Sequence, residues 1–281
     1  MTFEIVPNLS EGRNEATIDA AVASVLATGA RVLHRTSDAI HNRSVLTIAG
    51  DEREVLDAAI ALAGVAAQRI DLRRHQGVHP RIGALDVLPF VPLDGATMER
   101  AVHLAHQAGT AIWERWRIPS FFYGEAALAP GRRLLAEVRR GGFEGLDARF
   151  GRADWAPDVG DVAKHEGAGA IAIGAREILV AFNVVLESGD LALAKAIAGQ
   201  LREGGGGLTT LRALGLALGP HRVQISLNVT CYAATPLYRV LEVVRLLAAE
   251  RGVAVANGEL IGCLPLEAAA VTASYYLGIA P

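Results

Sequence analysis

AGAIAIGAREILVAFNVV, residues 168–185, contains two apolar runs on either side of the charged pair Arg176 and Glu177. Each run is short and apolar enough to be a β-strand covered on at least one face. On both sides of this stretch, short apolar runs alternate with amphipathic helical patterns. The sequence therefore predicts an α+β protein in which the alternation of strands and helices occurs twice.

The expected elements follow from periodicity and from helix stop signals. In the first half, strands are expected at 3–7, 32–37, 43–50 and 83–93, and helices at 14–29, 52–70 and 97–116, followed by a strand, a turn and a helix start in 119–134. In the second half, after the strands of 168–185, helices are expected at 191–203 and 237–252, a half-buried strand at 221–230, and a strand with a closing helix at 253–277.

Glycine and proline break the chain between residues 141 and 160, in GGFEGL and WAPDVG. Such a cluster marks a boundary between elements or subdomains. We expect two sheet-plus-helix subdomains, residues 1–155 and 156–281, with a ligand cleft between them. The glycine run at 204–207 breaks the second half.

The composition indicates a compact globular chain, with 51% hydrophobic and 20% charged residues. The net charge of −3 gives no global attraction to nucleic acid or to an anionic membrane. No uncharged apolar run reaches the ~20 residues that span a bilayer, and the N-terminus lacks a signal-peptide pattern. The two cysteines, Cys231 and Cys263, are expected to be buried thiols in a cytoplasmic protein.

RIDLRRHQGVHPRIGALDVLPF, residues 69–90, is the stretch richest in chemistry-bearing side chains. His75 and His79 are four residues apart, but Gly77 between them and Pro80 after them oppose the helix that a zinc pair needs. A metal site is therefore not expected. His79 is either a hydrogen-bonded surface group or a proton-transfer group, for which the ordinary histidine pKa of ~6.5 is suitable.

Polar residues gather at three other positions. SDAIHNRSV (37–45) places Asp38, His41, Asn42 and Arg43 in a turn between two strands. These residues either form local backbone hydrogen bonds, or Asp38 orients a base and Arg43 holds an anionic group.

In VPNLSEGRN (6–14), Ser10 or Asn14 can cap the following helix, and Asn8 and Glu11 can face a ligand. Arg176 begins an apolar strand, where its charge needs solvent or a partner. The sequence contains no Walker loop, no GxGxxG after the first strand and no GxSxG elbow. Proton transfer and substrate positioning are therefore expected, without a covalent intermediate or redox cofactor.

These stretches resemble the formiminotransferase family. The similarity rests on VPNLSEGRN (6–14), SDAIHNRSV (37–45), IDLRRHQGVHPRIGALDVLPFVPL (70–93), FFYGEAA (121–127), WAPDVG (155–160), GAREILVAFNVVL (174–186) and NGELIGCLPLEA (257–268), in that order along nearly the whole chain. HPRIGALD and VPNLSEGRN are the more specific of these stretches.

The resemblance implies two subdomains whose sheets face one another across a cleft that holds folate, and it implies a homodimer. It implies transfer of a formimino group from N-formimino-glutamate to tetrahydrofolate as co-substrate, in histidine catabolism and one-carbon metabolism. A different formimino donor, or a catalytically silent folate-binding or regulatory protein, remains an alternative.

The resemblance also implies site residues. His79 falls on the family's catalytic histidine and Asp38 on its supporting aspartate. The folate stretch falls on Gly160, Asp161, Val162, Ala163, Lys164, His165, Glu166 and Gly167. This stretch is shorter than is usual in the family, and residues 202–224 look truncated and lack the family's usual charged loop. Both departures favour divergence in how the substrate is held.

Overall fold

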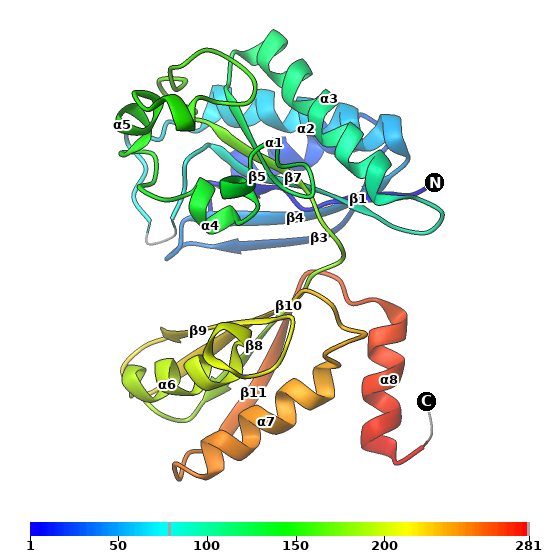
Figure 1. Cartoon of the computed structure of the whole chain (residues 1–281), viewed down its shortest axis with the longest axis vertical. Coiled ribbons are helices and arrows are strands. Elements are labelled where there is room, and N and C mark those ends of the chain that lie inside the picture. Colours follow the sequence, from blue (N-terminus) through cyan, green and yellow to red (C-terminus); the bar gives the residue numbers. More distant parts are fainter. Residues whose placement is uncertain (78–79, 280–281) are drawn as a thin grey trace. The chain divides into compact units, whose positions relative to one another are not determined.

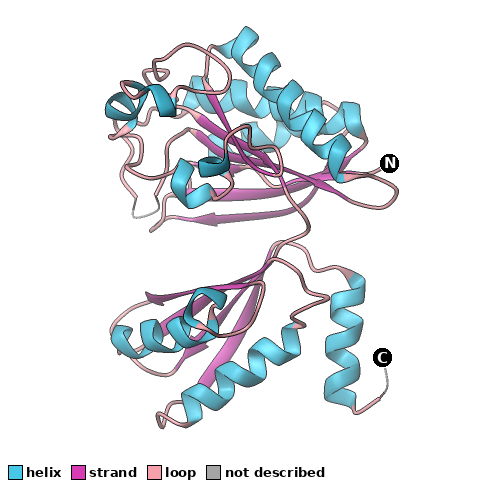
Figure 2. Cartoon of the chain, viewed as in Figure 1, coloured by secondary structure: helices cyan, strands magenta, loops and turns pink. Residues whose placement is uncertain are grey.

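The computed structural model describes residues 1–77 and 80–279. The chain divides into two compact units, Met1–Arg176 and Glu177–Pro281. Both units combine a β-sheet with helices, so the α+β class is confirmed. Figures 1 and 2 show the elements of each unit.

The first unit contains a mixed sheet. Its strands are β1 (Phe3–Ile5), β2 (Asn8–Leu9), β3 (Arg31–Asp38), β4 (Arg43–Gly50), β5 (Leu85–Pro92), β6 (Ser120–Gly124) and β7 (Ile171–Ala175). β3 pairs with β4. β1 and β2 lie one after the other between β4 and β5, and each pairs with both of these strands. β7 then lies between β5 and β6 and is parallel to both.

The boundary predicted from the sequence lies after residue 155, whereas the units divide after Arg176. The reason is the position of β7, which follows residue 155 in the chain but completes the first sheet. Parallel pairing joins strands that are far apart in sequence, so the local pattern does not reveal it.

Three long helices cover one face of this sheet (Figure 1): α1 (Glu15–Leu26), α2 (Glu52–Arg69) and α3 (Met98–Trp116). Their starts are capped by side chains, as the sequence led us to expect for Asn14, whose Oδ1 accepts the Thr17 N–H at 3.1 Å. Asp51 and Glu54 form a reciprocal capping box at the start of α2. The helices bury an apolar layer against the sheet that includes Phe3, Ile5 and Phe90.

The segment 130–155 contains only short helices: η1 (Pro130–Arg132), α4 (Leu135–Val138), α5 (Leu146–Phe150) and η2 (Ala153–Trp155). It packs on the other face of β6, because Phe122 faces α3 through His106 and its neighbour Phe121 must point the opposite way. Phe121 stacks on Phe150, with ring centroids 5.7 Å apart.

The second unit has an antiparallel sheet in the order β11-β8-β10-β9. Its elements are β8 (Val180–Leu186), α6 (Leu191–Leu201), η3 (Glu203–Gly205), β9 (Leu211–Ala217), β10 (Val223–Val229), α7 (Leu237–Ala249), β11 (Val255–Ile261) and α8 (Leu266–Leu277). α6 and α7 contribute Ile197, Leu201, Val240 and Val244 to its core, and α8 packs on α7.

One strand of this half was not predicted. Residues 202–224 contain β9, in which buried Leu211 and Ala213 alternate with exposed Arg212 and Leu214. One expectation was wrong, because Cys231 and Cys263 are both exposed rather than buried.

Candidate active site

The loop that follows α2 is tied to two other parts of the first unit. Near its start, the Leu72 N–H donates to the carbonyl of Gly167 at 2.8 Å. Further along, the Nε2–H of His75 donates to the backbone carbonyl of Asn42 at 3.0 Å. Burial lowers the pKa of His75 below its ordinary value, against the opposing effect of that hydrogen bond. His75 is therefore neutral near pH 7 and serves to anchor the loop.

His79 lies outside the described residues, together with Val78. Its catalytic role and its pairing with Asp38 thus stay predictions. The residues on either side of it do show where this part of the chain is fixed, at His75 before it and at Ile82 after it.

The turn between β3 and β4 joins this loop to segment 6–14. Asn42 has a left-handed backbone, with φ of 49°, which asparagine tolerates better than most residues. Its side-chain Oδ1 accepts the Gly12 N–H at 2.9 Å, and its Nδ2 donates to the carbonyl of Gln76 at 3.0 Å. Gly12 must be glycine, since a Cβ there would lie 2.2 Å from the carbonyl oxygen of Asp38.

Asp38 contacts His41 within the same turn. The Asp38 Oδ2 lies 2.8 Å from His41 Nδ1, and the Oδ1 accepts the backbone N–H groups of Ile40 and His41 at 2.8 and 2.9 Å. Burial alone would raise the pKa of Asp38, but the hydrogen bonds and the ring of His41 outweigh it and lower that pKa. The carboxylate is therefore charged and fixed in position at neutral pH.

The two side chains of segment 6–14 that were predicted to face a ligand, Asn8 and Glu11, form local hydrogen bonds. The Asn8 Nδ2 donates to the carbonyl of Val6 at 3.0 Å. The Glu11 Oε1 accepts the backbone N–H groups of Arg13 and Asn14 at 2.8 and 2.9 Å. These bonds shape the connection into α1. Both backbone N–H groups bond to Oε1 of Glu11, and neither bonds to Oε2.

Arginines gather around Asp86 beside these segments. Arg139 forms an ion pair with Asp86, and only 14% and 3% of the two side chains are exposed. The Asp86 Oδ1 accepts the Ile82 N–H at 2.7 Å and the Gly83 N–H at 3.3 Å. Burial, and then the charge of Arg139, lower the pKa of Arg43 to about 10, while the charges of Asp86 and Asp38 act in the opposite direction. Arg43 remains a cation at neutral pH.

Arg176 extends this group of cations at the end of β7, where its backbone N–H donates to the carbonyl of Phe90 at 3.1 Å. Burial raises the pKa of Tyr123, while the charges of Arg176 and Arg139 and a hydrogen bond with Arg176 lower it. Arg43, Arg139 and Arg176 therefore lie near a common region of the sheet. We call these three side chains the arginine cluster, which is suited to carboxylate groups.

The predicted folate stretch, 160–167, borders the loop that follows α2. His165 and Gly169 exchange backbone hydrogen bonds of 2.9 and 2.8 Å, and the His165 Nδ1 accepts the Ala168 N–H at 3.0 Å. Lys164 pairs with Asp147 at 2.7 Å. Exposed Glu166 lies 3.4 Å from Arg73 in the loop after α2.

Gly83 and Gly169 fix the close approach of this stretch to the start of β5. They form an antiparallel bridge, and a Cβ on Gly83 would lie 2.1 Å from the carbonyl oxygen of Ala170. Ala84 and Ala170 complete the contact by bonding to Ala168 and Ile82 at 2.9 and 3.0 Å. Residues 168–170, which directly follow the predicted folate stretch, thus pack against residues 82–84 at the start of β5.

Four segments that are distant in sequence therefore meet in the first unit: 6–14, 37–45, 71–86 and 160–169. Arg139, Tyr123 and the role of Asp86 were not predicted from the sequence. A signal existed for Asp86, since it is a charge within the otherwise apolar run LDVLPF (85–90). Arg139 and Tyr123 had no comparable signal, because their partners are far away in sequence.

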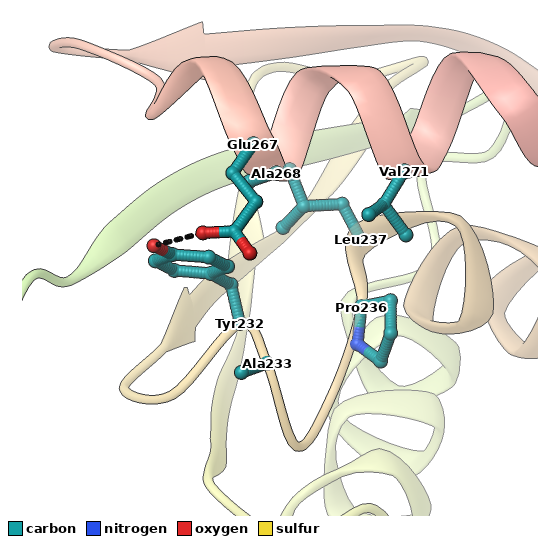
Figure 3. A pocket seen from close by; sticks show the side chains of 7 residues that line it. All are labelled: Tyr232, Ala233, Pro236, Leu237, Glu267, Ala268 and Val271. Atoms are coloured by element: carbon teal, nitrogen blue, oxygen red, sulfur yellow. Dashed lines mark hydrogen bonds between the residues drawn. The ribbon is translucent and has the colours of Figure 1, made fainter. Parts of the chain in front are cut away.

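The second unit has a cavity of about 200 Å³ between the start of α7 and α8 (Figure 3), lined by Tyr232, Ala233, Pro236, Leu237, Glu267, Ala268 and Val271. Apart from the Tyr232 hydroxyl, 3.4 Å from the Glu267 carboxylate, its lining is mostly apolar. It is smaller than the roughly 300–1,000 Å³ typical of ligand sites. It contains none of the predicted site residues, so the polar segments of the first unit are the better candidate.

Within residues 1–77 and 80–279, no group of three or more histidine, cysteine, aspartate or glutamate side chains is placed to hold a metal ion. The helices of the same residues include none that is long and apolar enough to cross a bilayer.

The sequence matches two family models, the N-terminal subdomain of the formiminotransferase domain over residues 2–176 and the formiminotransferase domain over residues 181–279. The chain belongs to the formiminotransferase family, and the resemblance seen in its motifs is confirmed. The first of these matches ends at the residue where the first structural unit ends.

Curated relatives are similar over nearly the whole chain. A glutamate formimidoyltransferase of Streptococcus pyogenes is 41% identical, over 98% of this chain and 93% of the relative. One of Thermoplasma acidophilum is 42% identical, over 98% of this chain and 91% of the relative. The formimidoyltransferase-cyclodeaminase of Sus scrofa is 39% identical, and the match covers 97% of this chain but 52% of that protein.

Proposed function

We propose that this protein transfers a formimino group from N-formimino-glutamate to tetrahydrofolate. The observation that carries the proposal is its 41–42% identity, over almost their full length, to two glutamate formimidoyltransferases. The structure supports it by bringing four of the family's stretches together in one unit. The protein would act as a cytoplasmic homodimer in histidine catabolism and one-carbon metabolism.

The reaction requires positioning and proton transfer. The N5 amine of tetrahydrofolate attacks the formimino carbon, a new C–N bond forms, and a tetrahedral intermediate results. The N5 proton is removed, the glutamate nitrogen gains a proton, and the old C–N bond breaks. Holding the two substrates side by side lowers the barrier by several kcal/mol, up to about 7–11 kcal/mol in well-oriented cases.

In this proposal His79 accepts the N5 proton, and residues 160–167 hold the folate. The arginine cluster binds substrate carboxylates, and its two members predicted from sequence, Arg43 and Arg176, supply charge-assisted hydrogen bonds. Asn8, Glu11 and Asn42 shape the backbone around the site through the hydrogen bonds described above.

Titration with tetrahydrofolate tests the binding half of the proposal. We expect about one site per chain by calorimetry, and a rise in the midpoint of thermal unfolding, because a ligand that binds only the folded state stabilises it. Binding without formimino transfer would identify a catalytically silent folate-binding protein. No heat and no stabilisation at saturating folate would contradict the proposal.

A further inference from the structure

His41 forms a histidine–carboxylate pair with Asp38, and no role has been assigned to His41 so far. The Asp38 Oδ2 lies 2.8 Å from His41 Nδ1, and 52% and 37% of the Asp38 and His41 side chains are exposed. A charged carboxylate at Nδ1 fixes the proton on that nitrogen and makes Nε2 the one that gains and loses a proton. It also stabilises the imidazolium once formed, as in catalytic triads.

The pair is not needed to hold the turn. The other oxygen of Asp38 already accepts the N–H groups of Ile40 and His41, and Asn42 joins the turn to Gly12 and Gln76. The ring of His41 is thus carried on a turn that other hydrogen bonds already hold. A rigid support is what a proton-transfer group requires.

The pair is also placed beside the loop that leads into the HPRIGALD segment. A Cβ on Gly77 would lie 2.4 Å from the carbonyl oxygen of His41, so the two backbones are in contact. His75 bonds to the residue that follows His41 in the chain. The turn that carries His41 and this loop therefore pack directly on one another.

Formimino transfer needs two proton transfers at different nitrogens. The N5 nitrogen loses a proton as its bond to carbon forms, and the glutamate nitrogen must gain one before its bond to carbon breaks, because an amide anion is a poor leaving group. Resting on the function proposed above, we propose that His41, held by Asp38, is a second proton-transfer residue and that its imidazolium protonates the departing glutamate nitrogen. His41 then recovers its proton from solvent, and the N5 proton goes to the base.

Imidazole rescue tests the assignment. We expect His41→Ala to lower kcat by about 10²–10⁴-fold, the range typical of general acid–base groups, with the KM for folate within a few fold. Added imidazole should raise the kcat of His41→Ala at least tenfold. The increase should follow the concentration of imidazolium rather than that of neutral imidazole. His41→Gln should show the same loss of kcat, and both variants should unfold within a few degrees of the wild type.

His103 is an exposed residue of α3, and His103→Ala is the matched control. This variant should leave kcat unchanged. Near-normal kcat in His41→Ala, or a loss that imidazole does not restore, would overturn the inference. An inactive wild-type protein would instead contradict the proposed function, so the two failures are distinguishable.

Discussion

His75 donates its Nε2–H to the backbone carbonyl of Asn42, 3.0 Å away, and so links the loop after α2 to the turn before β4. The two residues are 33 positions apart in the chain. Asn42 in turn bonds to Gly12 and Gln76. A single histidine and a single asparagine thus hold three of the family's stretches together.

The stability provided by His75 should depend on pH. Its pKa is lowered in the folded protein, below 6.5, so the unfolded chain binds the proton more readily. The contribution of His75 is then fully present above about pH 6.5 and is lost as the pH falls toward the folded-state pKa. Urea unfolding of the wild type and His75→Gln should show a stability difference that is larger at high pH. A difference independent of pH, or one shared by exposed His103→Gln, would contradict this.

Asp158 should be essential for holding segment 130–155 on the sheet. It pairs with Arg132 at 2.7 Å, with 8% and 7% of the side chains exposed, and also accepts the Phe122 N–H at 2.7 Å. Asp158→Asn leaves the Arg132 charge buried without its counter-ion, so the free energy of unfolding should fall by about 3–5 kcal/mol. Glu125→Gln removes the exposed partner of Arg133 and should cost at most about 1 kcal/mol. Equal effects in denaturant unfolding would refute the assignment.

Arg176→Lys should weaken substrate binding. Lysine keeps the charge but not the planar fork of donors that pairs with a carboxylate. A hydrogen bond to a charged group contributes about 1.5–3 kcal/mol, and 1.4 kcal/mol corresponds to tenfold in affinity. Steady-state kinetics should show a KM raised by roughly tenfold or more for at least one substrate. Arg133→Lys is the exposed control, and unchanged KM values for both substrates in Arg176→Lys would be inconsistent with a ligand contact.

Metal chelation should leave activity intact. Residues 1–77 and 80–279 offer no group of three suitable ligands, and the proposed chemistry uses histidine and arginine side chains. Dialysis against EDTA followed by the transfer assay is the measurement. Activity that disappears and returns on addition of zinc would require a metal in the mechanism.

The elements with strong periodicity were predictable from the sequence. The patterns at 52–70 and 97–116 correspond to α2 (Glu52–Arg69) and α3 (Met98–Trp116) because each has one continuous apolar face and a capped start. β9 was missed because Gly215 interrupts its alternation of apolar and polar residues. Gly215 packs against the backbone of α6, where there is no space for a side chain. That the two sheets face each other across a ligand cleft stays a prediction.

The candidate site could be predicted only as separate stretches. The sequence identified the segments around Asn42, His75 and His165, but their mutual contacts depend on the folded chain. Arg139 and Asp86 are 53 positions apart in the chain. The folded backbone brings such partners together, and no local sequence pattern indicates them. The contact between Asp38 and His41 is local, three positions apart, but the sequence alone did not single it out. The predicted support of His79 by Asp38 stays a prediction.

Formimino transfer itself is the most direct test of the central claim. The measurement is the rate of formation of 5-formimino-tetrahydrofolate from N-formimino-glutamate and tetrahydrofolate by the wild type, His79→Ala and His75→Ala. We expect product only when both substrates are present, a kcat lower by about 10²–10⁴-fold in His79→Ala with folate affinity within a few fold, and a much smaller loss in His75→Ala. Folate binding without product formation by the wild type, even at enzyme concentrations comparable to those of the substrates, would contradict the claim.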